Sequence, residues 1–305
     1  MITNYTKKLI NNLPKELKNK KKPIKLDLVL DGGVFNGSYL FGALYFLKEM
    51  ENQNYMCIER ISGSSVGSIA GLIYFMDCLD YYQYLYKIVI NDFKKTYNLK
   101  IITQLYFYLK DKMPENICER VNGKFFITYY DIKKGKKIIK SKFSNAEDLV
   151  NTVINSCFLP FLIDGNMLNN NRYIDGLNPY CFDAKPHKKI LYLDLFGMDK
   201  IKYLFNVKNE NTTCHRILNG LLDIHEFFIK QTSTSMCSFV SEWSFYDNFK
   251  YNIKLLLEYI IVFIVYFIGF VRKYFKKNMK KYGFYKLLST FGYKLYILLL
   301  KSYCL

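Results

Sequence analysis

Apolar positions in the first part of the chain alternate between a strand pattern and a helix pattern. Residues 24–30 form an apolar run typical of a buried strand, and an Asp-Gly-Gly turn follows it directly. From Ser38 onward, apolar side chains recur three and four positions apart, which predicts a helix with a buried face. A second strand over 57–61, a sharp turn and a small-residue helix over 66–75 repeat the order. This alternation predicts a parallel sheet covered by helices on both faces.

The same alternation continues toward residue 200. Asn145 can cap one helix, and Glu147 and Asp148 then favour its first turn through the helix dipole. The expected fold class is α/β, with three α/β/α layers, a mostly parallel central sheet and a helical C-terminal tail. Helices are predicted over 82–93, 101–109 and 146–156, and strands over 124–129, 136–139 and 189–196, with a shorter strand that ends at 174.

The C-terminal tail, residues 251–305, is both apolar and basic. Seventeen residues, 255–271, are interrupted only by Glu258, which is near the lower length limit for crossing a hydrocarbon core. A second stretch over 284–300 alternates Lys with apolar residues in an interfacial pattern. We expect the tail to attach to a membrane surface, either by one transmembrane segment near 255–271 or by lying flat. The alternative is a buried helix followed by a surface helix.

Positive charge is concentrated at the two ends of the chain. Of a formal net charge of +18, residues 1–25 contribute +7 and residues 250–305 contribute +10, which leaves +1 for the body. Basic ends suit an anionic membrane or nucleic acid, because Lys and Arg gain attraction near such surfaces. They are also consistent with solvated faces. We expect no nucleic-acid partner, because the chain has no recognisable binding motif.

Cysteine usage and the N-terminal pattern indicate the compartment. Eight cysteines are scattered without a CxxC pair, so we interpret them as reduced thiols and expect no metal site. The first thirty residues lack the apolar core of a secretory signal. Both observations favour an intracellular catalytic domain, which we expect to be membrane-associated through its C-terminal tail.

Three segments carry candidate chemistry. Residues 63–67, Gly-Ser-Ser-Val-Gly, fit the G-x-S-x-G nucleophile elbow between a strand and a helix, although a glycine turn without chemistry has the same pattern. The loop Asp-Gly-Gly-Val-Phe-Asn-Gly over 31–37 opens a helix, so its free N–H groups suit an oxyanion hole. It matches neither a P-loop nor a Rossmann fingerprint. Asp175 ends a strand in an apolar setting, where lost solvation raises proton affinity and suits a base.

Together with Ser-Cys-Phe-Leu-Pro over 156–160, these segments resemble the patatin-like phospholipases over roughly residues 24–200. The resemblance implies a lipid acyl hydrolase that cleaves fatty-acyl esters of phospholipids or acylglycerols through an acyl-enzyme, without histidine, metal or organic cofactor. It implies Ser65 as nucleophile, Asp175 as base, and Gly32, Gly33 and Val34 as the oxyanion segment. The motif glycines are Gly37, Gly63, Gly67 and Gly176.

The resemblance and the charge pattern together predict four parts in the chain. These are a basic arm over 1–23, a catalytic core over 24–200, a helical extension over 201–250 and the membrane-associating tail over 251–305. Tyr and Phe are dense over 80–142, and we interpret them as core in preference to an acyl-chain wall.

Three positions depart from the family pattern. Val34 replaces a usual Gly, Asn36 a usual Arg or Lys, and Leu177 a usual Gly or Ala. A β-branched residue resists positive φ, so Val34 bears directly on the oxyanion loop. Two alternatives therefore stay open. The chain could be a catalytically silent membrane-binding protein with this fold, or a Ser-Asp-His α/β-hydrolase that uses His215 or His225, although that fold usually has more strands before its elbow.

Overall fold

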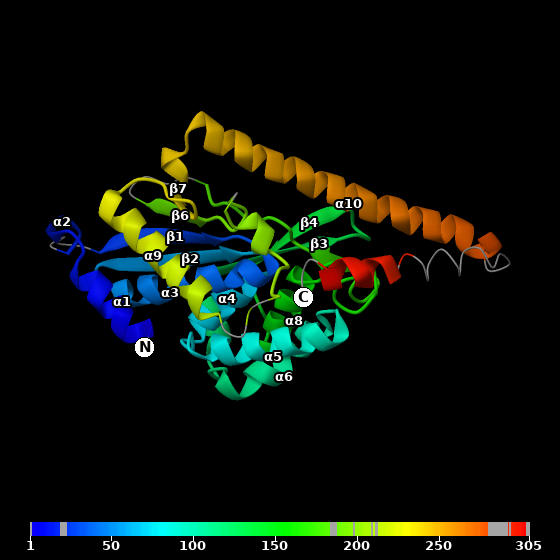
Figure 1. The fold of residues 1–305 in the computed structure, drawn as a ribbon, viewed down its shortest axis with the longest axis horizontal. Coiled ribbons are helices and arrows are strands. Elements are labelled where there is room, and N and C mark those ends of the chain that lie inside the picture. The colour runs from blue at the N-terminus through cyan, green and yellow to red at the C-terminus, as the bar shows by residue number, and fades with distance from the viewer. Residues whose placement is uncertain are drawn as a thin grey trace.

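The computed structural model describes residues 2–18, 23–183, 188–197, 199–208, 210, 213–279, 292 and 294–302. Among these residues, seven strands form one mixed sheet with helices on both faces (Figure 1). The strand order is β4-β3-β2-β1-β6-β7, and β5 pairs with β3 outside this path. The strands are β1 (Ile24–Leu30), β2 (Met56–Gly63), β3 (Phe125–Asp131), β4 (Lys136–Lys140), β5 (Tyr173–Asp175), β6 (Lys189–Leu193) and β7 (Cys237–Phe239).

The centre of the sheet is parallel and its periphery is antiparallel. Strands β6, β1, β2 and β3 run in one direction, whereas β4, β5 and β7 each pair with a neighbour in the opposite direction. The α/β class and the three-layer arrangement predicted from the sequence are confirmed.

Helices form the outer layers. The helices are α1 (Ile2–Asn11), α2 (Lys15–Lys18), α3 (Gly37–Asn52), α4 (Val66–Phe75), α5 (Tyr81–Thr96), α6 (Leu105–Leu109), α7 (Ile117–Val121), α8 (Ala146–Ser156), α9 (Cys214–Lys230) and α10 (Phe245–Met279). Short 3₁₀ segments are η1 (Val34–Asn36), η2 (Lys100–Gln104), η3 (Lys110–Lys112), η4 (Ile201–Tyr203) and η5 (Val240–Glu242). The side chain of Asn145 accepts the Asp148 N–H at 2.8 Å, so the predicted cap of α8 forms.

Side-chain alternation along β1 explains the two layers. Leu28 and Leu30 point into the main core with α3, α4 and α9. Val29 points to the opposite face and joins a smaller cluster that includes Tyr192 and Tyr251 of α10. Successive side chains of a strand point to opposite faces, so an apolar run serves both layers.

Helices α3 and α9 approach each other at backbone distance. A methyl group at Gly42 of α3 would lie 2.0 Å from the carbonyl oxygen of Ile217. A methyl group at Gly220 of α9 would lie 2.0 Å from the carbonyl oxygen of Tyr39. Glycine is therefore required on both helices, and α9 is an integral part of the core.

The two ends of the chain lie against the domain. Leu9 and Ile10 of α1 are buried in the main core. The stretch 255–271 lies within α10, whose segment Phe245–Val271 is long and apolar enough to cross a membrane, with 11% of its most apolar window buried. The predicted interfacial stretch over 284–300 falls partly on 284–291 and 293, which lie outside the described residues. Residues 294–302 are helical, and Leu300 is buried against the core.

The described cysteines are all free thiols. Cys304 lies outside the part of the chain that the structure describes.

Candidate active site

Ser65 occupies a strained turn between β2 and α4. Its φ of 52° and ψ of −129° lie outside the regions that non-glycine residues favour. The flanking glycines make the turn possible, because a methyl group at Gly63 would lie 2.6 Å from the Gly67 carbonyl oxygen. A methyl group at Gly67 would lie 2.3 Å from the Leu30 carbonyl oxygen. The turn has the strand, sharp bend and helix that a nucleophile elbow requires.

Strands β2 and β5 lie along the same edge of β3. Gly63 at the end of β2 pairs with Ile127, and Asp175 at the end of β5 pairs with Tyr129. Strand β4 occupies the other edge of β3 at both positions. Because β2 runs parallel and β5 antiparallel to β3, their carboxyl ends point toward each other across two residues of β3, or about 7 Å. The topology thus brings the Ser65 turn and Asp175 to one place.

The segment over 156–158 joins these two residues. The Ser65 N–H donates to Ser156 Oγ at 3.0 Å, and the Asp175 N–H donates to the Phe158 carbonyl oxygen at 2.9 Å. Cys157 Sγ donates to the Ser65 carbonyl oxygen at 3.2 Å. This explains structurally why the Ser-Cys-Phe-Leu-Pro stretch accompanies the other motifs.

The Asp175 carboxylate is buried, and one of its two oxygens accepts a hydrogen bond from a described residue. Its Oδ1 accepts the Leu177 N–H at 2.7 Å, while its Oδ2 is buried and has no hydrogen-bond partner among the described residues. Burial raises the pKa of Asp175 to about 7, and the Leu177 N–H and the Ser65 hydroxyl oppose the shift. The hydroxyl is therefore close to the carboxylate, although these two side chains form no hydrogen bond within 3.5 Å. Catalytic hydrogen bonds often shorten only when substrate binds.

The glycine loop lies against the Ser65 turn. A methyl group at Gly32 would lie 3.2 Å from Ser65 Cβ and 3.2 Å from the Leu177 carbonyl oxygen. The Gly32 N–H donates to Asp31 Oδ1 at 2.9 Å. In the described part of the chain, the N–H groups of Gly33 and Val34 donate no hydrogen bond, so both are available to a substrate oxygen.

Backbone strain gathers at three residues around this loop. Val34, Ser65 and Leu177 have φ values of 45°, 52° and 56°. Val34 and Leu177 are two of the three departures noted in the sequence. The loop therefore forms with Val at position 34, in a left-handed conformation that costs a β-branched residue free energy.

The third departure, Asn36, is buried beside a cation from another helix. Asn36 Oδ1 accepts Arg216 Nη1 at 2.9 Å, and Asn36 Nδ2 donates to the Lys200 carbonyl oxygen at 2.9 Å. Arg216 is fully buried and pairs with Glu210. The sequence shows Asn36 where the family usually has Arg or Lys. It gives no sign that Arg216 of α9 places a cation next to Asn36. Gly37 is needed next to it, because a methyl group there would lie 2.2 Å from Val66 Cγ2.

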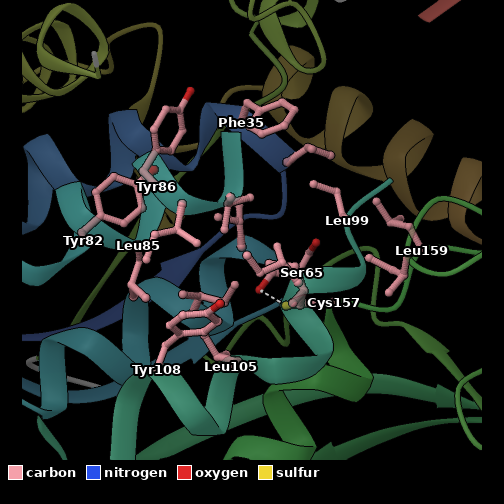
Figure 2. Close-up of a pocket in the computed structure, with 18 residues that line it drawn as sticks. Phe35, Ser65, Tyr82, Leu85, Tyr86, Leu99, Leu105, Tyr108, Cys157 and Leu159 are labelled. Atoms are coloured by element: carbon pink, nitrogen blue, oxygen red, sulfur yellow. Dashed lines mark hydrogen bonds between the residues drawn. The ribbon is translucent and has the colours of Figure 1, made fainter. Parts of the chain in front are cut away.

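An apolar pocket opens at Ser65 (Figure 2). Its walls come from Val34, the region of α5, η2 and α6, and the segment after α8. The region 80–142 supplies both buried core and pocket wall, since Tyr82 and Tyr86 are buried and also line the cavity. Other lining residues include Leu85, Leu99, Leu105 and Leu159.

The two described histidines lie away from this constellation. His215 Nε2 is 3.5 Å from Glu210 Oε1, and the His225 ring packs against Phe46 with centroids 5.9 Å apart. Neither histidine is among the described contacts of Ser65 or Asp175, while His187 lies outside the described residues. No cluster of three metal-ligating side chains is found in the described ranges.

Comparison with known proteins places the region around this site in a family. Residues 28–177 match the family model described as patatin-like phospholipase. The omega-hydroxyceramide transacylase of Homo sapiens is 22% identical over 154 residues, which cover 48% of this chain and 29% of that protein. The 1-acylglycerol-3-phosphate O-acyltransferase Pnpla3 of Mus musculus is 28% identical over 71 residues, which cover 22% of this chain and 17% of that protein. The matched region thus spans less than a third of either relative's length.

Proposed function

Because residues 28–177 make this chain a member of the patatin-like phospholipase family, whose relatives are lipid-acting enzymes, we propose that it is a lipid acyl hydrolase with a Ser65–Asp175 dyad. The observation that supports the proposal is an apolar pocket that opens at Ser65, together with the buried Asp175 carboxylate, whose Oδ2 has no hydrogen-bond partner among the described residues.

The dyad acts by acyl transfer to the serine. Asp175 Oδ2 takes the proton from Ser65 Oγ as that oxygen attacks the acyl carbonyl. The N–H groups of Gly33 and Val34 stabilise the resulting oxyanion. Collapse of the tetrahedral intermediate breaks the bond to the alcohol, and Asp175 returns the proton to this leaving group. Water then attacks the acyl-enzyme with Asp175 as base, which releases the fatty acid and restores Ser65.

The pocket indicates the class of substrate. Its lining is mostly aliphatic and aromatic, which suits the hydrocarbon chain of a fatty-acyl ester rather than a charged group. We therefore propose phospholipids or acylglycerols as substrates. The names of the two relatives indicate transfer to an alcohol, so an acylglycerol acceptor in place of water is the second candidate reaction.

We further propose that α10 holds the enzyme on an intracellular membrane. Leu257, Tyr259 and Phe263 are exposed on this helix, so lipid contact would remove their apolar surface from water. Its charged residues Lys254 and Glu258 contact the domain, which favours a helix lying flat over one crossing the bilayer. Basic residues after 271 suit anionic lipid.

A direct assay tests the dyad. Wild type, Ser65→Ala and Asp175→Asn are incubated with vesicles of a phospholipid labelled in its acyl chain, with and without added monoacylglycerol. We expect fatty-acid release by wild type alone, and loss of about 10³-fold or more in each variant. Labelled diacylglycerol as the main product would favour the transfer reaction. Equal release by wild type and Ser65→Ala would contradict the proposal.

A further inference from the structure

Helix α10 has two faces of opposite character. Lys250, Lys254 and Glu258 recur every four residues and therefore share one face, which contacts the sheet. Phe263 on the outer side is 68% exposed, and Tyr259 is 67% exposed. The polar face lies against the domain and much of the apolar surface faces outward.

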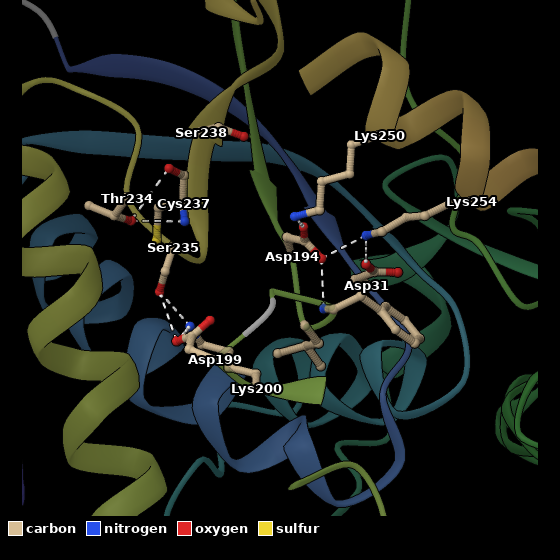
Figure 3. A network of polar contacts seen from close by, with 12 residues as sticks. Asp31, Asp194, Asp199, Lys200, Thr234, Ser235, Cys237, Ser238, Lys250 and Lys254 are labelled. Carbon is tan, nitrogen blue, oxygen red and sulfur yellow. Dashed lines mark hydrogen bonds and ion pairs between the residues drawn. The ribbon is translucent and has the colours of Figure 1, made fainter. Parts of the chain in front are cut away.

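The contact that Lys254 makes reaches the proposed oxyanion loop, residues 31–37 (Figure 3). Lys254 Nζ donates to Asp31 Oδ2 at 2.7 Å and to Asp194 Oδ1 at 2.6 Å. The other oxygen of Asp31 accepts the Gly32 N–H at 2.9 Å. A continuous chain of hydrogen bonds thus runs from α10 through one buried carboxylate to the Gly32 peptide, which lies beside the Ser65 turn.

The contact that Glu258 makes reaches the segment that follows Asp175, the proposed base. One turn further along α10, Glu258 Oε2 accepts the side-chain N–H of Asn178 at 2.7 Å and its backbone N–H at 3.3 Å. Glu258 also accepts Lys137 Nζ at 2.9 Å and the Tyr130 hydroxyl. Asn178 follows Asp175 by three positions. The only acidic residue in the apolar stretch 255–271 is therefore used to hold the chain that carries the base.

We propose that Lys254 and Glu258 are positioning residues. Lys254 holds the loop over 31–37 and Glu258 holds the segment over 175–178, so the lipid-facing helix is also part of the active centre. The inference rests on the proposed hydrolase function. Lys254 keeps the Asp31 carboxylate ionised and in place, and this carboxylate orients the Gly32 peptide ahead of the N–H groups of Gly33 and Val34. Glu258 fixes Asn178 and thereby the turn that carries Asp175.

The charges around Asp31 support this role. Burial raises the pKa of Asp31 to about 6, Lys254 opposes the shift, and the nearby Asp194 adds to it. Without Lys254 the buried carboxyl would bind a proton more readily and become a weaker acceptor for the Gly32 N–H.

Lysine variants of the full chain test the first contact. Lys250 is a matched control, because it pairs with the same Asp194 at 2.7 Å but is not a described partner of Asp31. With soluble p-nitrophenyl butyrate we expect Lys254→Gln to lower kcat about 100-fold with little change in KM. Lys250→Gln should stay within about twofold of wild type, and Lys254→Arg should recover most of the activity. Binding to phosphatidylserine-containing vesicles should be the same in all four proteins. Equal kcat in Lys254→Gln and Lys250→Gln would overturn the inference.

Amide hydrogen exchange separates this inference from the hydrolase proposal, because it needs no turnover. In Lys254→Gln we expect faster exchange over residues 31–37 and unchanged protection in α3. If Ser65→Ala showed that the chain does not use this serine, the hydrolase proposal would fail while the exchange experiment still reported on the loop. Unchanged exchange over 31–37 would overturn the role of Lys254.

The pH profile tests the second contact. Glu258 raises the pKa of Asp175, whereas Lys137 and the Ser65 hydroxyl lower it. Glu258→Gln should therefore move the acid limb of kcat/KM to lower pH, and Lys137→Gln should move it to higher pH. Limbs that coincide with wild type in both variants would contradict an electrostatic effect of Glu258 on Asp175. Positioning is measured separately, because Glu258→Leu removes the acceptor of both Asn178 N–H groups and should speed amide exchange over residues 176–178. Unchanged exchange there would overturn the positioning role of Glu258.

Discussion

The two faces of the central sheet are covered by different kinds of contact. On one face, α3 and α9 meet at backbone distance through Gly42 and Gly220, over a large apolar core. On the other face, α10 is held by buried charges, above all by Lys254 and Glu258, over a small apolar cluster. Close packing tolerates little change of shape, whereas ion pairs depend on geometry and on the charge of each partner. We infer that the first face holds the fold and that the second connects the active centre to its surroundings.

The largest effect is expected from enlarging the packed face. Gly220→Val would place side-chain carbon against the backbone of Tyr39, which lies 2.0 Å from a methyl group at that position. We expect a loss of about 4 kcal/mol or more in the free energy of unfolding, measured by urea denaturation. Gly269→Val of α10 is a control for residue type, since a methyl group at Gly269 would lie 3.4 Å from Met167 Cε, an ordinary contact distance, and Gly269 has no positive φ. A Gly220→Val protein as stable as wild type would contradict the claim that close packing of α3 and α9 holds the fold.

A smaller loss is expected from the charged face. Asp194→Asn removes the ionic partner of Lys250 while Lys254 keeps its contact with Asp31. We expect a loss of about 2 kcal/mol, mainly as faster hydrogen exchange in α10 with the α3–α9 pair still protected. Uniformly faster exchange in both regions would mean that the two faces unfold as one unit.

Asp175, the proposed base, should titrate near neutrality. Asp175 must be ionised to accept a proton, and burial raises its pKa to about 7. We expect kcat/KM to fall by about tenfold per pH unit below that value, because the protonated fraction then dominates. The rate of release of a soluble ester product across pH 5 to 9 provides the measurement. A flat profile down to pH 5 would exclude a base with this raised pKa.

Relief of strain at the oxyanion loop should give a modest gain. Val34→Gly removes a β-branched side chain from a φ of 45°, and we expect the protein to gain about 1 kcal/mol in unfolding free energy. Ile139→Gly is the control, because Ile139 is exposed on strand β4 and glycine there should lower the unfolding free energy. A loss of stability in Val34→Gly would show that packing of this side chain outweighs its backbone strain.

The smallest effect on stability is expected on the outer side of α10. Phe263→Ser should change the unfolding free energy by less than about 0.5 kcal/mol, because this side chain is 68% exposed. The same variant should float less with lipid vesicles while keeping its activity on a soluble ester. Unchanged flotation would contradict the proposed lipid contact.

Much of the fold and the candidate chemistry could be predicted because it is encoded locally. The helix expected over 66–75 and the strand expected over 24–30 are found with those bounds, and Ser65 lies on the turn between strand and helix. These features depend on periodicity, glycine and short-range spacing.

The supporting contacts could not be predicted, because they join distant parts of the chain. Arg216 beside Asn36 and Lys254 beside Asp31 follow from how α9 and α10 pack on the sheet. Glu258 was visible only as an interruption of an apolar stretch. Its partners, Lys137 and Asn178, become evident only in three dimensions.

The central claim, that Ser65 is a nucleophile activated by Asp175, is tested most directly by covalent trapping. A fluorophosphonate with a long alkyl chain is mixed with wild type and Asp175→Asn, and the modified residue and its rate of labelling are determined by mass spectrometry. We predict phosphonylation of Ser65 in wild type and a rate at least about 100-fold lower in Asp175→Asn. Labelling elsewhere in the chain, or equal rates in the two proteins, would contradict the account.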